Sequence, residues 1–382
     1  MHRLQFHYTL SRQSSPAQVR NPLIDLLQAI ATHGSISAAA RALHLSYRHV
    51  WGELKRWEQV LGSELLVWEK GQSARLTEFG SKLMWAEGQA QARLAPQIEA
   101  LRSELERAFA VAFDPDAHVV TLYASHDHAL GELREVALSN EPDGFAETAP
   151  QQLHLDIRFC GSVDAIRGLN EGRCVMAGFH TLHSPAPGSL AEKTYKPLLK
   201  PGLHKIIGFA SRMQGLMVAR GNPLGLHKLQ DVAHTKARFV NRALGTGTRV
   251  VLDGLLEQAG IASHALWGYG NTEPSHSAVA HAIASGAGDA GLGIESAARS
   301  QGLDFVPLAQ EQYHLVCLKS ALEDPAIQAL LALLQSTRWQ AHLAAMPGYA
   351  PVQSGQVQSL RKVLPWWDFP VKARARRTAY KP

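Results

Sequence analysis

Residues 118–318 alternate between short runs rich in β-branched and aromatic side chains and longer runs with helical periodicity. VVTLYA is followed by HALGELREVAL, LHLDIRFC by SVDAIRGLNEG, and ARFVNR by TRVVLDGLLEQAG. Alternation of strands and helices is typical of α/β domains with mainly parallel sheets. Ligands of such sheets bind outside the carboxyl ends of strands, where helices begin. This pattern constrains the fold more than any other feature of the chain, and it predicts an α/β domain over residues 118–350.

The length and composition indicate a soluble protein with more than one domain. A chain of 382 residues exceeds the usual size of a single domain, and 46% hydrophobic with 19% charged residues is typical of globular proteins. No run approaches the roughly 18 to 20 apolar residues that a membrane span needs. The first residues also lack the apolar core of a signal peptide. We therefore expect a cytoplasmic protein without a membrane partner.

The segment before this domain predicts three short helices with tight turns between them. The third helix, SYRHVWGELKRWEQVLG, places Val50, Leu54, Trp57 and Leu61 along one face. Its other face carries aromatic and basic side chains: Tyr47, Arg48, His49, Lys55 and Arg56. Two short helices joined by a tight turn, the second with a basic polar face, are what insertion into the major groove of DNA requires.

The residues after this helix predict a two-stranded wing. LLVW and ARL are strand-like, and a turn containing Gly71 separates them. Arg75 lies where a wing meets DNA phosphates. The net charge of +5 also agrees with a polyanionic partner.

These residues resemble known DNA-binding regulators. SISAAARALHLSYRHVWGELKRWEQVLG and the following LTEFG are similar to the helix-turn-helix of LysR-type regulators, and LSYRHVW is closer still to the molybdate-responsive ModE regulators. The resemblance covers residues 21–85. It implies a winged helix-turn-helix domain over 1–85, in which Ser46, Tyr47, Arg48 and His49 face bases or phosphates of double-stranded operator DNA.

Residues 86–115 predict a long helix that is interrupted near Pro96. The segment is rich in Ala, Glu and Arg, and its apolar residues include Leu94, Ile98, Leu101 and Leu105. In LysR-type proteins a helix at this place pairs two subunits, so the resemblance implies a homodimer or homotetramer. The alternative is a helix that packs within its own domain.

Four junctions between strands and helices in the α/β domain carry hydroxyl groups and glycines. A helix start with free N–H groups and hydroxyls forms a natural oxyanion site, and each junction taken alone also fits a helix N-cap. Asp127 would repel an anion there unless it caps a helix or points away. The candidate effector-binding residues are Ser125, His126, Ser162, Thr246, Gly247, Thr248, Arg249, Ser275 and His276.

The same region resembles the two-lobed PBP-like sensor domain that occurs in LysR-type regulators and in fusions to ModE-type DNA-binding regions. The matching segments are ASHDHAL, GSVDAIRGLNEGRCVMAGFHTL, FVNRALGTGTRVVLD and HSAVAHAIASGAGDAGLGI. Relatives of this domain bind molybdate or tungstate between two lobes. The charged Arg249 departs from the neutral donors usual in such pockets, which leaves formate or another small carboxylate open as the effector.

The hypothesis is therefore a regulator of genes of molybdenum- or tungsten-related metabolism, with no catalytic residues, no metal site and no cofactor besides the effector. GxSxG, the Walker lysine motif and an early GxGxxG are missing from the sequence, and its three cysteines form no CxxC pair. The alternative is a solute-binding protein or an enzyme on a PBP-like scaffold. Residues 351–382 form a basic C-terminal tail.

Overall fold

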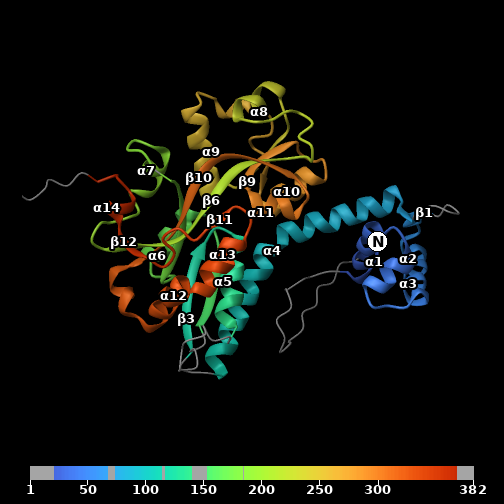
Figure 1. Ribbon diagram of the computed structural model, residues 1–382, viewed down its shortest axis with the longest axis horizontal. Coiled ribbons are helices and arrows are strands. Elements are labelled where there is room, and N and C mark those ends of the chain that lie inside the picture. Colours follow the sequence, from blue (N-terminus) through green and yellow to red (C-terminus); the bar gives the residue numbers. More distant parts are fainter. Residues whose placement is uncertain (1–20, 68–73, 114–116, 140–152, 184, 368–382) are drawn as a thin grey trace, which may run out of the picture.

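The computed structural model describes residues 21–67, 74–113, 117–139, 153–183 and 185–367. The tip of the expected wing, 68–73, and the basic end of the tail, 368–382, lie outside the described residues. A small helical head and a larger α/β body are joined by one long helix (Figure 1). Among the described helices, none is long and apolar enough to cross a membrane.

The head contains three helices and a two-stranded wing. The helices are α1 (Pro22–His33), α2 (Ile36–Ala42) and α3 (Tyr47–Leu61), and the strands β1 (Leu66–Val67) and β2 (Arg75–Leu76) pair antiparallel. Asn21 and Ser35 cap α1 and α2, and Gly34 ends α1 in the left-handed conformation (φ 69°) that glycine adopts without strain. The buried residues of these helices, including Leu27, Ile30 and Leu54, form a separate core.

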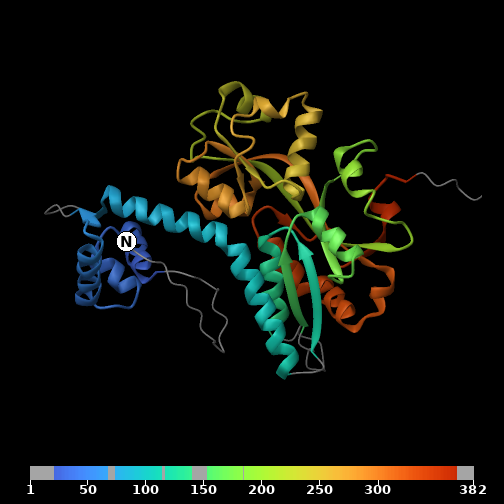
Figure 2. The ribbon, with the colours of Figure 1, turned by 180° about the vertical axis from the view of Figure 1, so that it is seen from behind.

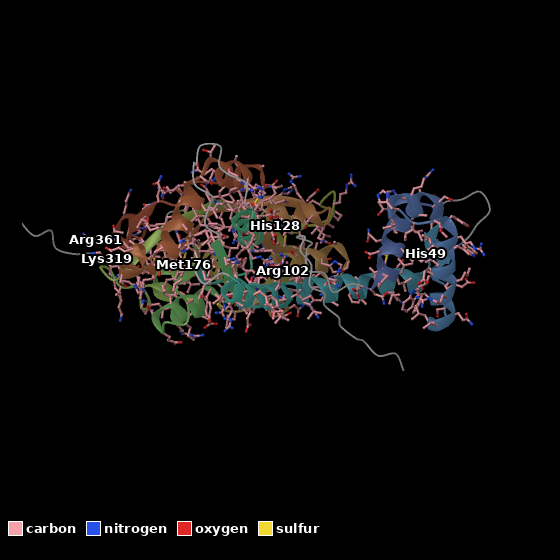
Figure 3. All side chains as sticks on the ribbon, turned by 90° about the horizontal axis from the view of Figure 1, so that it is seen from below. His49, Arg102, His128, Met176, Lys319 and Arg361 are labelled. Carbon is pink, nitrogen blue, oxygen red and sulfur yellow. The ribbon has the colours of Figure 1, made fainter. Side chains whose placement is uncertain are left out.

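The long helix α4 (Glu78–Phe113) joins the head to the body and is unbroken where the sequence predicts an interruption. Pro96 lies inside it, and the helix bends near its middle instead of ending (Figure 2). In Figure 3, His49 lies on the head, whereas Arg102 lies on the part of α4 that runs along the body.

The body is built on one sheet with the strand order β4-β3-β5-β10-β6-β9-β7-β8, and β11 and β12 also pair with β6. The prediction of mainly parallel strands is wrong. The pairs β3–β4, β3–β5, β7–β8 and β7–β9 are parallel, whereas every described pair that includes β6 or β10 is antiparallel. The strands are β3 (His118–Ala124), β4 (Leu153–Phe159), β5 (Met176–Leu182), β6 (His204–Val218), β7 (Phe239–Arg242), β8 (Thr272–Glu273), β9 (Ala290–Ile294), β10 (Asp304–Leu318), β11 (Tyr349–Ala350) and β12 (Val357–Ser359).

Strands β6 and β10 are 15 residues each and run through both lobes of the body. One part of β10, Glu311–Cys317, pairs with β5, and the end of β6, Gln214–Val218, pairs with β9. The first lobe therefore contains β3, β4 and β5, and the second lobe contains β7, β8 and β9. The sequence predicts KIIGFASR and GLMVARG, and likewise LDFVPL and EQYHLVCLK, as separate strands, whereas the first two form β6 and the last two form β10.

Helices cover both lobes (Figure 1). Those around the first lobe are α5 (His128–Leu138), α6 (Ser162–Asn170), α7 (Leu190–Tyr195), α12 (Pro325–Gln335), α13 (Thr337–Ala345) and α14 (Leu360–Val363), with the 3-10 turn η2 (Lys319–Glu323). Those of the second lobe are α8 (Leu229–Thr235), α9 (Gly247–Gln258), α10 (His276–Ala284) and α11 (Glu295–Ser300), with η1 (Ser263–Ala265).

Candidate functional site

Helix α3 presents its first turn to solvent. The Ser46 hydroxyl accepts a hydrogen bond from the backbone N–H of His49 (3.2 Å) and so caps the helix. Because Val50 and Leu54 are buried in the head, Tyr47, Arg48 and His49 are exposed. No ion-pair partner of Arg48 is found among the described residues. The guanidinium of Arg48 is therefore exposed and not held by a described acid.

The other predicted DNA-contacting cations differ from Arg48. Lys55 pairs with Glu58 (2.7 Å) and lies over the Trp51 ring, and Arg56 pairs with Glu53 (2.5 Å). Both are exposed, but each is held by an acid of its own helix. Arg75, on β2, is also exposed and has no ion-pair partner within the described part of the chain.

The predicted strand-to-helix junctions begin α5, α6, α9 and α10. At α5 the Asp127 carboxylate accepts a hydrogen bond from the Ala129 N–H (2.8 Å), so this acid caps the helix. Thr246 caps α9 and Ser275 caps α10 through their hydroxyls. Gly161 occupies the cap position of α6 without a side-chain hydrogen bond.

Three of the predicted hydroxyls lie in the region where the lobes meet. The Ser125 and Ser162 hydroxyl oxygens are 3.4 Å apart in the first lobe. In the second lobe the Thr248 hydroxyl is 3.3 Å from Nε2 of His276. All four side chains are buried.

The two lobes touch at this place. A Cβ atom built on Gly161 would lie 2.7 Å from the carbonyl oxygen of Gly245, and one built on Gly247 would lie 2.8 Å from the Cβ of His180. These glycines therefore allow the first and second lobes to approach closely. A cavity of about 280 Å³ adjoins the contact, lined by residues of β5 and α9 that include His180, Thr181 and Val251.

A buried ionic cluster lies next to the hydroxyls. The guanidinium of Arg212 donates to the carboxylates of Asp127 and Glu311, and both partners are fully enclosed. Tyr349 donates to Asp127 (2.9 Å) and Gln214 to Glu311 (3.0 Å). Burial raises the pKa of Glu311 even though the charge of Arg212 opposes the shift. Arg212 is thus fully neutralised within the protein.

Arg242, the last residue of β7, makes no ion pair with the described residues, although the charge of Asp127 partly offsets its own. It is 2% exposed, and its Nε and Nη1 atoms have no hydrogen-bond partner among the described residues. Burial, and then the nearby charge of Arg212, lowers the pKa of its guanidinium to about 9. A buried cation without a partner is costly, and it is the group that a bound anion would stabilise.

Further buried polar atoms around Arg242 have no described partner. They are both ring nitrogens of His180, Nδ1 of His276 and the hydroxyl of Tyr313. Burial, followed by the charges of neighbouring arginines, holds the pKa values of His180 and His276 well below the ordinary value, so both rings are neutral. Most buried polar groups in proteins are hydrogen-bonded, so this concentration of exceptions indicates a site for a polar ligand.

Arg249, predicted as the cation of this site, is engaged elsewhere. Its guanidinium pairs with Asp253 at 3.2 Å, one helical turn further along α9, and lies 3.9 Å from the centre of the Tyr269 ring. The buried guanidinium without an acidic partner among the described residues is that of Arg242 instead.

Two other predicted effector-binding side chains face α4. Nε2 of His126 is 3.2 Å from the Glu99 carboxylate, and the Ser275 hydroxyl donates to the carbonyl oxygen of Ala92 (3.2 Å). Thus Ser125 lies in the inter-lobe region while its chain neighbour His126 contacts α4. In the second lobe, His276 contacts Thr248 while its neighbour Ser275 contacts α4.

The sequence analysis missed Arg242, Arg212, Glu311 and His180. One observation could have revealed Arg242: it ends the strand FVNR, in which every residue is buried, and a charged residue at the carboxyl end of such a strand is typical of a ligand site. Within the described residues, no group of three His, Cys, Asp or Glu side chains could hold a metal ion. Burial also raises the pKa of Cys174 and of Cys317 to about 11, so these thiols are protonated.

Comparison with known proteins assigns both parts of the chain. Residues 144–335 match the PBP superfamily domain, and residues 23–81 match the bacterial regulatory helix-turn-helix protein, lysR family. The protein YvgK of Bacillus subtilis is 31% identical over 200 residues, which is 52% of this chain and 64% of YvgK. A protein encoded in the 5′ region of a ferredoxin 2Fe-2S gene of Clostridium pasteurianum is 29% identical over 109 residues, 28% of this chain and 96% of its own.

Solved structures with a similar chain course include LysR-type regulators. Corynebacterium glutamicum OxyR, as the C206 mutant, is 16% identical, with 88% of this chain and 96% of that chain covered and a TM-score of 0.41. Full-length CbnR in complex with its target DNA is also 16% identical, with coverages of 83% and 98% and a TM-score of 0.39. Residues 144–335 make up half of the chain, so the protein belongs to the PBP superfamily domain family, and its head is a helix-turn-helix of the lysR family.

Proposed function

We propose that this regulator responds to a small oxyanion bound between its lobes, and that the effector is molybdate, tungstate or a small carboxylate such as formate. The observation that carries the proposal is the buried guanidinium of Arg242, which lacks a partner among the described residues. Hydroxyls of Ser125, Ser162 and Thr248 lie in the same inter-lobe region and supply neutral donors. An anion that leaves water needs several such donors together with one compensating charge.

Binding of the effector would favour one arrangement of the lobes and thereby one arrangement of the DNA-binding heads. The regulated genes proposed for such an effector belong to molybdenum- or tungsten-related metabolism. On the DNA side, α3 supplies Tyr47, Arg48 and His49 to the major groove, and Arg75 supplies a phosphate contact from the wing.

The proposed assembly is a homodimer or homotetramer through α4. Large apolar side chains are exposed at regular spacing along its second half: Leu101 (57%), Leu105 (36%) and Phe109 (40%). They lie four residues apart, and therefore on one face of the helix. Burying such a stripe against a second copy removes apolar surface from water.

The test is a thermal-shift and calorimetric titration of the full-length protein with molybdate, tungstate, sulfate and formate. A ligand that binds the native state raises the apparent midpoint of unfolding. We expect at least one of these anions to do so in the wild type and not in Arg242→Gln. If every anion leaves the midpoint unchanged, or if Arg242→Gln binds as tightly as the wild type, the oxyanion proposal fails.

A further inference from the structure

Helix α4 contacts both lobes of the body, and Pro96 separates the two sets of contacts. Before Pro96, Arg93 donates two hydrogen bonds to Glu273 of the second lobe, at 2.9 and 2.7 Å. After Pro96, Ser103 accepts from Arg134 (2.9 Å) and Arg107 pairs with Asp156 (2.9 Å), both in the first lobe. The bend of α4 visible in Figure 2 thus lies between the part held by one lobe and the part held by the other.

The carbonyl oxygen of Ala92 connects the bend to the second lobe. In a regular helix this oxygen accepts a hydrogen bond from the N–H of residue 96, but proline has no N–H. The Ser275 hydroxyl donates to the Ala92 carbonyl oxygen at 3.2 Å. The Ser275 hydroxyl oxygen itself accepts a hydrogen bond from the Ala278 N–H (3.0 Å) and so caps α10. Pro96 therefore bends α4 and also leaves the Ala92 carbonyl oxygen without its helical donor, so that this oxygen accepts a hydrogen bond from Ser275 of the second lobe.

The Glu273 carboxylate makes a second strong contact between the same two elements. Its side chain is 8% exposed and, among the described residues, accepts hydrogen bonds only from α4: two from Arg93 and one from Gln89 (3.1 Å). If the second lobe moved away from α4, this carboxylate would lose its cation while still partly enclosed. Such a separation is costly, so the helix and the lobe are expected to move together.

The residues that hold α4 are chain neighbours of residues in the inter-lobe region. His126, which contacts Glu99 of α4, lies between Ser125 and Asp127. Ser275, which contacts Ala92, precedes His276, whose ring faces Thr248. A shift of either junction on closure of the lobes therefore displaces a contact with α4.

We infer that α4 transmits a change in the relative position of the two lobes to the DNA-binding head. Pro96 is the pivot, and the contacts of Arg93 and Ser275 attach the second lobe to α4. The inference rests on the proposed function, since it describes how the effector site and the head communicate. Linkage is reciprocal, so fixing the heads on DNA must also change the lobes. This allows a test that needs no identified effector.

The experiment compares hydrogen exchange of the full-length protein with and without bound DNA. The DNA is a duplex that the wild-type protein has selected from a pool of random sequences. In the wild type, DNA binding is expected to change exchange in peptides covering residues 246–249 and 272–278. Arg93→Ala and Ser275→Ala should lose this change. Arg107→Ala is the matched control: it also removes an arginine of α4 that pairs with a carboxylate of the body, but only in the first lobe, so it should keep the change.

Pro96→Ala tests the pivot without altering any charge. The new N–H donates to the Ala92 carbonyl inside the helix and competes with the Ser275 hydroxyl for it, and the helix loses the cause of its bend, so the change in exchange should be reduced. A wild type that binds DNA without any change at these peptides would overturn the inference, as would equal behaviour of Arg93→Ala and Arg107→Ala. Failure to select any DNA would instead contradict the proposed function.

Discussion

Arg212 and Arg242 lie in one buried polar cluster, yet only Arg212 is paired. Arg212 contacts two enclosed carboxylates, whereas two of the three guanidinium nitrogens of Arg242 make no hydrogen bond with the described residues. The charge of Arg212 also contributes, after burial, to the lowered pKa of Arg242. One guanidinium is thus paired within the protein, and the other is the group that the proposed anion would contact.

Replacing Arg242 by methionine should stabilise the protein without ligand while abolishing anion binding. Methionine removes the unsatisfied guanidinium nitrogens from the interior, and a buried polar group without a partner costs about 1–3 kcal/mol. Urea unfolding measures the free energy of unfolding, and calorimetry measures binding. Arg238→Met is the control, because Arg238 is a more exposed arginine beside the same strand and is paired with Asp289. A destabilised Arg242→Met that still binds the anion would contradict the assignment.

Replacing Arg48 by alanine should weaken DNA binding by about 1–3 kcal/mol if its guanidinium reads a base. Fluorescence anisotropy with a selected duplex measures the affinity. Arg167→Ala, on the exposed surface of α6 in the body, removes the same charge far from α3 and should leave the affinity unchanged. Equal affinities of Arg48→Ala and the wild type would remove Arg48 from the contact surface.

Replacing Leu105 by glutamate should dissociate the proposed dimer, because it places a charge in the middle of the apolar stripe on α4. Analytical ultracentrifugation at micromolar concentration measures the mass. Leu224→Glu, at an exposed leucine (45%) on the second lobe, is the control and should leave the mass unchanged. A monomeric wild type with full affinity for DNA would contradict the dimer.

The stability of the body should fall as the pH is lowered from about 7 to 5. Burial lowers the pKa of His314 to about 3 and holds those of His180 and His276 far below the ordinary value. In the unfolded chain these histidines bind protons below about pH 6.5, whereas in the folded protein the buried rings stay neutral. Each ring therefore lowers the free energy of unfolding by about 1.4 kcal/mol per pH unit below that value. Unfolding free energies of His314→Gln should depend less steeply on pH, whereas His264→Gln, at an exposed turn, should follow the wild type.

The sequence predicted the helix starts well because their determinants are local. Hydroxyls and glycines between an apolar run and a periodic run mark a helix N-terminus, which is where Ser162, Thr246 and Ser275 lie. The spacing of Arg249 and Asp253, four residues apart, also contained the information that this arginine is paired within its own helix.

The orientation of neighbouring side chains could not be predicted in this way. Ser125 and His126 differ by one position, but which of them faces the inter-lobe region depends on how α4 packs against the body. The merging of two predicted strands into β6 likewise depends on partners distant in the chain, because its polar middle is buried only where β10 and the lobes surround it. Such non-local contacts leave no pattern in a single sequence.

In the proposed coupling, the distance along α4 from Pro96 to the head determines how far the head moves. Glu78, the first residue of α4, lies 18 positions before Pro96, which at a rise of about 1.5 Å per residue is an arm of roughly 27 Å. A rotation of about 10° at the bend therefore displaces the head by roughly 5 Å, which exceeds the 3.4 Å rise of one base pair. In the proposed coupling, a rotation of this size would be enough to move α3 out of register with a DNA half-site.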